Sequence, residues 1–123
     1  MPRILIVEDD EDVRALIAHK LRRAGHEVSE AGDGELGLAA ARASAPDLMV
    51  LDWMMPKLTG IEVCAQVRAD PALTQPRILL LTAKSQDSDI ALAMATGADG
   101  YLIKPFRANE LLERVTALLA ATE

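Results

Sequence analysis

The sequence has little cysteine, few aromatic residues and no excess of positive charge, and each shortage excludes a class of protein. Cys64 is the only cysteine, so the chain has no internal disulfide framework and a reducing compartment is favoured. No apolar stretch approaches the roughly 20 residues that a membrane-spanning helix needs, and the short apolar start is no signal peptide. We therefore expect no membrane contact and a cytoplasmic location.

The charge balance argues against a nucleic-acid surface. Lys and Arg together number 13, Asp and Glu together number 19, and the formal net charge is −6. Binding to a phosphate backbone needs clustered cations, which this chain lacks. We therefore expect no direct contact with nucleic acid.

What remains is the size and pattern of one domain. The 123 residues are about the usual length of a single domain, which we expect to span 1–123. Continuous apolar runs predict strands buried on both faces of a parallel sheet. They lie at Ile4–Val7, Leu48–Leu51, Ile78–Leu81 and Tyr101–Ile103, with a weaker edge candidate at 26–31. Segments with helical character fill the gaps, at 12–24, 34–43, 60–69, 87–96 and 108–120.

The alternation of strand and helix predicts an α/β fold, a doubly wound five-stranded parallel sheet with five helices. Five such units favour the flavodoxin-like strand order 2-1-3-4-5, which makes the first and third strands neighbours at the topological switch point. Ligands of such sheets bind beyond the carboxyl ends of the strands, near that point. Functional residues are therefore expected just after Val7, Leu51 and Leu81.

Acidic side chains occupy two of those places. Glu8 and Asp9 follow the first strand, and Asp52 follows the third. Neighbouring strands are about 4.8 Å apart, and two carboxylates at about 5 Å repel by roughly 3 kcal/mol at an effective dielectric near 20. An all-oxygen cluster of this charge favours Mg²⁺. The acids at 10–12 are instead expected to stabilise the start of a helix.

Two donor side chains follow the other strands. Thr82 is one strand from Asp52, and Lys104 is two strands away, about 10 Å of sheet that its long side chain can largely cross. A carboxylate nucleophile, a metal ion, and cationic and hydroxyl donors are the parts of a phosphoryl-transfer site. No general base is needed, because an ionised carboxylate is already nucleophilic.

Four segments resemble the response-regulator receiver domains of two-component signalling, and the resemblance covers essentially the whole chain. They are ILIVEDD at 4–10, LMVLDWMMPKLTG at 48–60, LLLTA at 79–83 and GADGYLIKPF at 97–106. The resemblance implies a switch that takes a phosphoryl group from a sensor histidine kinase or a histidine phosphotransfer protein. Phosphorylation would change its binding to a downstream effector protein that the sequence does not identify.

The same resemblance implies a role for each site residue. Asp52 matches the phosphoryl acceptor, and Asp9 matches the direct ligand of Mg²⁺. Glu8 matches the acid that acts through a metal-bound water. Met54 matches the position whose backbone carbonyl completes the metal shell.

The remaining matches concern the phosphoryl group and the switch. Thr82 and Lys104 match the hydroxyl and the amine that contact the phosphoryl group, and Tyr101 matches an aromatic whose ring position is coupled to that hydroxyl. The Lys104–Pro105 bond resembles one that is cis in the family. Such a protein would catalyse only its own phosphorylation and dephosphorylation, and would not be an enzyme with an external substrate.

Three alternative functions on the same fold agree less well with the sequence than this interpretation does. A flavin or dinucleotide carrier would want a phosphate-binding loop rich in Gly, Ser or Thr after the first strand, where this chain has acids. A phosphatase with an aspartyl-phosphate intermediate would need a second acid and a cap over its substrate, and neither is evident. A receiver that has lost its chemistry is disfavoured because every site residue is present.

The sequence also bears on assembly. Receivers of winged-helix transcription factors pair through the face of the fourth helix, fifth strand and fifth helix, using ion pairs between subunits. This chain keeps Asp99, Glu110 and Arg114 of that set, but has Ile90 and Gly100 where charges are expected. With half of the set missing and no linker after the last helix, we expect a stand-alone receiver that is a monomer before phosphorylation.

Overall fold

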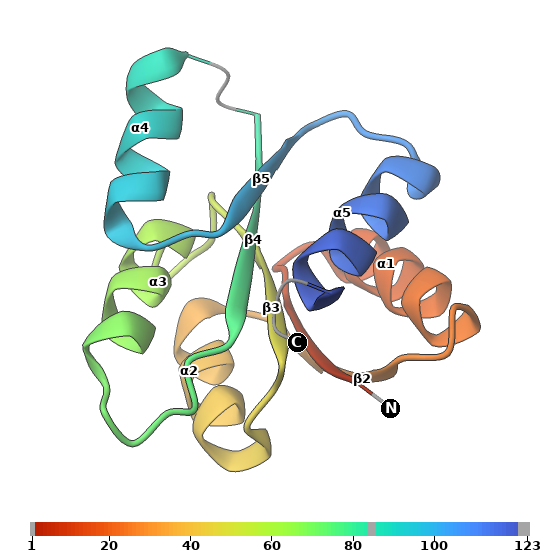
Figure 1. The fold of residues 1–123 in the computed structure, drawn as a ribbon, viewed down its shortest axis with the longest axis horizontal. Helices are drawn as coiled ribbons and strands as arrows, with labels where there is room; N and C mark the ends of the chain where they lie inside the picture. Colours follow the sequence, from red (N-terminus) through yellow and green to blue (C-terminus); the bar gives the residue numbers. More distant parts are fainter. Residues whose placement is uncertain (1, 84–85, 121–123) are drawn as a thin grey trace.

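Five strands and five helices alternate along the chain (Figure 1). The computed structural model describes residues 2–83 and 86–120. The elements are β1 Arg3–Val7, α1 Glu11–Arg23, β2 Glu27–Ala31, α2 Gly34–Ser44, β3 Leu48–Asp52, α3 Gly60–Ala69, β4 Arg77–Thr82, α4 Asp87–Thr96, β5 Gly100–Ile103 and α5 Ala108–Ala120. Within the described ranges, no helix combines the length and the apolar character needed to cross a membrane.

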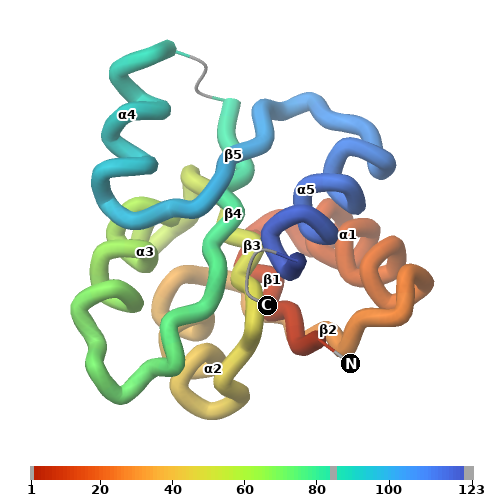
Figure 2. The backbone as a smooth tube through the Cα atoms, viewed as in Figure 1, coloured from red at the N-terminus to blue at the C-terminus, as the bar shows by residue number. Residues whose placement is uncertain are grey.

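The strands form one parallel sheet in the order β2-β1-β3-β4-β5, which confirms the predicted topology. Figure 2 shows β1 lying between β2 and β3. In the register of this sheet Val7 lies opposite Leu51, so the residues that follow these two strands emerge at the same level. The sheet therefore brings the carboxyl ends of β1 and β3 together at one edge.

The helices cover both faces of the sheet. Helices α1 and α5 lie on one face, and α2, α3 and α4 lie on the other (Figure 1). Along β1, Leu5 and Val7 join one apolar core while Ile4 and Ile6 join the other. Successive side chains of a strand point to opposite faces, so a strand between two helical layers is apolar throughout.

The exposure of the edge strand β2 and the start of helix α1 both agree with the local sequence. As expected for an edge, β2 is mostly exposed, and only Ala31 is fully buried. Helix α1 begins one residue earlier than predicted because the Asp10 carboxylate caps it, accepting hydrogen bonds from the backbone amides of Asp12 and Val13. The expectation that the acids at 10–12 start a helix is thereby confirmed.

Candidate functional site

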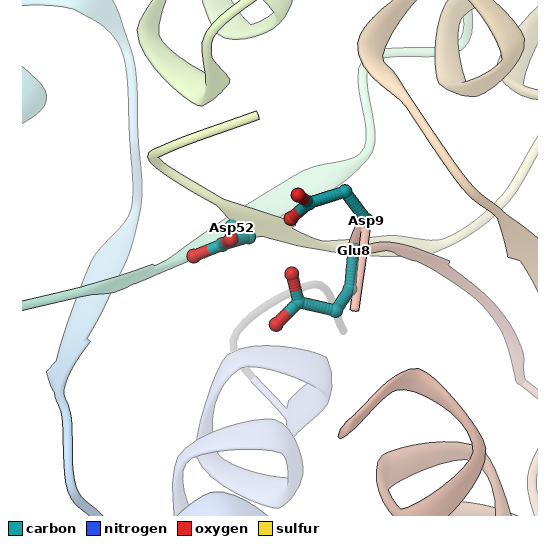
Figure 3. Close-up of side chains that lie close together, drawn as sticks. All are labelled: Glu8, Asp9 and Asp52. Carbon is teal, nitrogen blue, oxygen red and sulfur yellow. The ribbon is translucent and has the colours of Figure 1, made fainter. Parts of the chain in front are cut away.

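Three carboxylates meet at the carboxyl edge of the sheet. Glu8 and Asp9 follow β1 directly, and Asp52 is the last residue of β3. Figure 3 shows the side chains of Glu8 and Asp9 close to that of Asp52. One oxygen from each of the three lies within 4.8 Å of the others. Glu8 is 1% exposed and Asp52 is 6% exposed, whereas Asp9 is open to solvent.

Lys104 reaches this cluster from the end of β5, two strands away from β3 in the sheet. The Lys104 amine, which follows β5, donates to Oδ1 of Asp52 at 2.9 Å and to Oε1 of Glu8 at 3.2 Å. Its backbone amide donates to the carbonyl of Thr82 at 2.8 Å, and the following bond to Pro105 is cis, as the resemblance implied. Burial lowers the pKa of the Lys104 amine, but the hydrogen bonds and charges of Asp52 and Glu8 together outweigh burial and hold the pKa above its usual value.

The cluster retains an unbalanced negative charge. Oε2 of Glu8 is buried and has no hydrogen-bond partner among residues 2–83 and 86–120. Burial and the neighbouring Asp52 together raise the pKa of Glu8 to about 8, against the opposing effect of Lys104. A buried oxygen without a partner is costly unless something binds it. The donor set, all oxygen and acidic, fits a hard divalent cation such as Mg²⁺.

The other residues singled out in the sequence border this cluster. Thr82 is the last residue of β4, next to Asp52 in the sheet, and is almost fully buried. Met54 lies in the loop just after Asp52 with its side chain 65% exposed. Tyr101 is half-buried in β5, packs against the apolar core, and has the guanidinium of Arg114 6.0 Å from its ring centroid.

Sequence reasoning missed two residues that shape the site. A Cβ at Gly60 would lie 2.5 Å from the carbonyl oxygen of Asp52, so only glycine lets α3 begin this close to the end of β3. The capping box of Thr59 and Glu62 at this helix start could have indicated that position. Arg14, whose guanidinium donates to the carbonyl of Glu8, carries no comparable signal in the sequence.

The charges expected on the α4-β5-α5 face have partners within the chain. Asp99 pairs with two arginines of the chain, at 2.8 and 3.2 Å. Glu110 accepts a hydrogen bond from the backbone at the start of α5. Arg114 donates to the carbonyl of Tyr101 at 2.6 Å. These contacts are local to one molecule.

Comparison with known proteins places these features in context. The model of the family described as "Response regulator receiver domain" matches residues 4–116. The transcriptional regulatory protein PhoP of Bacillus subtilis, for alkaline phosphatase synthesis, is 45% identical over 98% of this chain and 50% of its own length. The DNA-binding dual master transcriptional regulator RpaA of Synechocystis is 44% identical over 100% of this chain and 51% of its own length.

A solved structure agrees with these relatives. The chemotaxis protein CheY4 of Vibrio cholerae superposes with a TM-score of 0.90 at 34% identity, over 96% of this chain and 98% of that one. The present chain spans about half the length of the curated relatives it matches.

Proposed function

The chain belongs to the response regulator receiver domain family of two-component signalling, and we propose that Asp52 is its phosphoryl acceptor. The observation that carries the proposal is the meeting of Glu8, Asp9 and Asp52 within 4.8 Å, with Lys104 on the Asp52 carboxylate. The strand register supports the assignment, because Asp52 ends the central β3 at the switch point of the sheet.

Asp52 acts in this proposal as the nucleophile. An oxygen of its carboxylate forms a bond to phosphorus as the phosphorus–nitrogen bond to the donor's histidine breaks, and the imidazole remains on the donor. Receiver domains of this family interact with histidine kinases or phosphotransfer proteins. A carboxylate nucleophile of this kind needs no general base to remove a proton during the reaction.

The neighbouring acids would hold the cation. Glu8, Asp9, Asp52 and the backbone carbonyl of Met54 are the proposed ligands, with Glu8 acting through a water molecule. The buried, unpartnered Oε2 of Glu8 supports this set. When bound, Mg²⁺ supplies positive charge that stabilises the charge on the phosphoryl oxygens.

Lys104 and Thr82 would bind the phosphoryl group once it is in place. The Lys104 amine is already at the acceptor, so a small movement transfers its hydrogen bond from Asp52 to a phosphoryl oxygen. Thr82, at the end of the adjacent strand, would turn its hydroxyl toward the same group. Tyr101 would respond to that movement and change the surface that an effector recognises.

The proposal extends to what the protein modifies and to its oligomeric state. We propose a module that modifies only itself, and a monomer before phosphorylation, which is supported by the local partners of Asp99, Glu110 and Arg114. A cytoplasmic location stays a prediction.

PhoP and RpaA are named as transcriptional regulators, RpaA as DNA-binding, and both are about twice as long as this chain. The comparison therefore gives no support to the expected lack of contact with nucleic acid.

Intact-mass spectrometry tests the acceptor. The protein is incubated with acetyl phosphate and Mg²⁺, and we expect the mass of one phosphoryl group to be added. EDTA before the donor should prevent the addition, and Asp52→Asn should not gain it. Asp10→Asn is the matched control, because Asn also caps a helix and Asp10 lies outside the cluster. Labelling of Asp52→Asn equal to that of the wild type would show that the acceptor lies elsewhere.

A further inference from the structure

We propose that Arg14 is a positioning residue that holds the turn carrying Glu8 and Asp9 against Asp52. Its guanidinium, on α1, donates from Nη1 to the backbone carbonyl of Glu8 at 2.9 Å. The inference rests on the proposed function of the site, since it assigns Arg14 a role in holding the cation there. It adds a residue that no motif in the sequence indicates.

The turn after β1 is tied at three points. The backbone amide of Glu8 donates to the carbonyl of Ala31 at 3.1 Å, which extends the pairing of β1 with β2. The backbone amide of Arg14 donates to the carbonyl of Asp10 at 2.9 Å, within the first turn of α1. The carbonyl of Glu8 is fixed by a side chain instead, the guanidinium of Arg14.

Arg14 is itself held in place by β2 and the residue after it. Its Nε lies 3.5 Å from Oε1 of Glu30, and the Arg14 side chain is 19% exposed. Gly32 leaves room for it, because a Cβ there would lie 3.3 Å from Nη1. The guanidinium is thus enclosed by α1, β2 and the start of the next loop, so it presents a fixed donor to the Glu8 carbonyl.

This contact suits a site that must keep its carboxylates free. The carboxylates of Asp9 and Asp52 lie within 4.8 Å of each other, and repulsion between them favours movement of the turn away from β3. A cation paired directly with the carboxylates would compete with Mg²⁺ for the same oxygens. Arg14 binds the backbone carbonyl instead, so it restrains the turn and adds nearby positive charge without occupying a ligand atom.

Arg22 provides a matched control. Its Nη2 also binds Glu30, at 3.2 Å from Oε2, and donates to the carbonyl of Val28. These contacts of Arg22 lie on β2, whereas Arg14 also contacts the turn that carries Glu8. Arg14→Gln and Arg22→Gln therefore each remove one arginine from Glu30, and they differ in the contact with the turn.

Mg²⁺ titration followed by tryptophan fluorescence tests the role of Arg14. Trp53 is the only tryptophan, is buried, and follows Asp52 directly. Loss of a group that orients metal ligands typically weakens metal affinity by about 10-fold or more, and we expect this for Arg14→Gln. Arg22→Gln should stay within about 2-fold of the wild type, and Arg14→Lys, which keeps a cationic donor, should recover part of the affinity.

The outcomes separate this inference from the proposal on which it depends. If the wild type shows no Mg²⁺ response, the proposed function of the site is wrong. If the wild type responds and the two Gln variants bind Mg²⁺ equally, the positioning role of Arg14 is wrong. Should Arg14→Gln fail to fold, Arg14→Lys is compared with Arg22→Lys. Weaker Mg²⁺ binding by Arg14→Lys then supports the inference, and equal affinities overturn it.

Discussion

The two ends of the same sheet carry ionic clusters of opposite character. At the carboxyl end, the carboxyl groups of Glu8, Asp9 and Asp52 lie together, and the ammonium group of Lys104 pairs with those of Glu8 and Asp52. At the amino end of β4 and β5, the one carboxylate of Asp99 is shared by two guanidinium groups, those of Arg68 and Arg77. Both clusters are partly buried and both join several elements, so burial alone does not distinguish them.

The difference lies in how far each cluster satisfies its own groups. Arg68 donates to Asp99 and to the carbonyls of Gly97 and Pro76, and Asp99 also accepts from the backbone amide of Ile78. In the carboxyl-end cluster, the buried Oε2 of Glu8 has no hydrogen-bond partner among the residues that the structure describes. A cluster that serves the fold is complete within the chain, whereas one that serves binding retains unmet capacity for a ligand.

The largest expected effect concerns pH and Glu8. In the metal-free folded protein, burial and Asp52 raise the pKa of Glu8 from its ordinary value of 4.5 to about 8. Between these values the folded state binds more protons than the unfolded state, so the free energy of unfolding falls as pH rises from about 4.5 to about 8. Each pKa unit corresponds to about 1.4 kcal/mol, so the fall attributable to this group amounts to several kcal/mol.

Urea denaturation in EDTA across this pH range measures the effect. Glu8→Gln, which has no titrating proton, should lack this component, so its curve and that of the wild type should diverge toward high pH. Saturating Mg²⁺ should suppress the loss in the wild type, because the cation replaces the proton. Parallel curves for the two proteins in EDTA would contradict the unbalanced character of the carboxyl-end cluster.

Disruption of the balanced cluster should have the next largest effect. Asp99→Ala removes the carboxylate that Arg68, Arg77 and the Ile78 amide share, and we expect the free energy of unfolding to drop by about 2 kcal/mol. This expected loss of stability is smaller than that for a fully buried ion pair, because the side chains of Asp99, Arg68 and Arg77 are 23–34% exposed. Chemical denaturation measures it, and Asp99→Asn, which keeps an acceptor oxygen, should lose about half as much. A cost near zero for Asp99→Ala would show that this cluster is not structural.

The sequence was most informative where local pattern decides structure. The order of strands and helices followed from the alternation of apolar runs and helical periods, and the convergence of Glu8, Asp9 and Asp52 followed from strand ends in a parallel sheet. The approach of Lys104 to Asp52 followed in the same way. These predictions succeed because the positions of strand ends are set by topology and not by side-chain detail.

The partners of the arginines could not be predicted in this way. Arg68 and Asp99 are 31 residues apart, and Arg14 reaches a backbone carbonyl, which every residue carries. No periodicity marks such contacts, because they depend on which side chains the packed helices bring within reach. Asp99 illustrates the consequence, since the resemblance placed its charge at an interface and the structure pairs it with Arg68.

The smallest expected effect concerns Asp9, the exposed member of the carboxyl-end cluster. Asp9→Asn removes a charge that repels Asp52, so the metal-free protein should become slightly more stable. Because Asp9 is open to solvent, the gain should stay below about 1 kcal/mol. The same substitution removes a proposed ligand, so Mg²⁺ should raise the melting temperature less than it does in the wild type.

Thermal unfolding with increasing Mg²⁺ measures both parts of this prediction, and Asp10→Asn is the control. Asp10 carries the same charge one residue further along, but its carboxylate caps α1, and Asn is an equally good cap. We therefore expect Asp10→Asn to leave the Mg²⁺ response close to that of the wild type. If Asp9→Asn instead destabilises the metal-free protein and keeps the full Mg²⁺ response, then Asp9 is a structural residue of the turn. The carboxyl-end cluster would then consist of Glu8 and Asp52 alone, with the Lys104 ammonium group between them. Its contrast with the amino-end cluster would then rest only on the buried Oε2 of Glu8, which has no hydrogen-bond partner among the described residues.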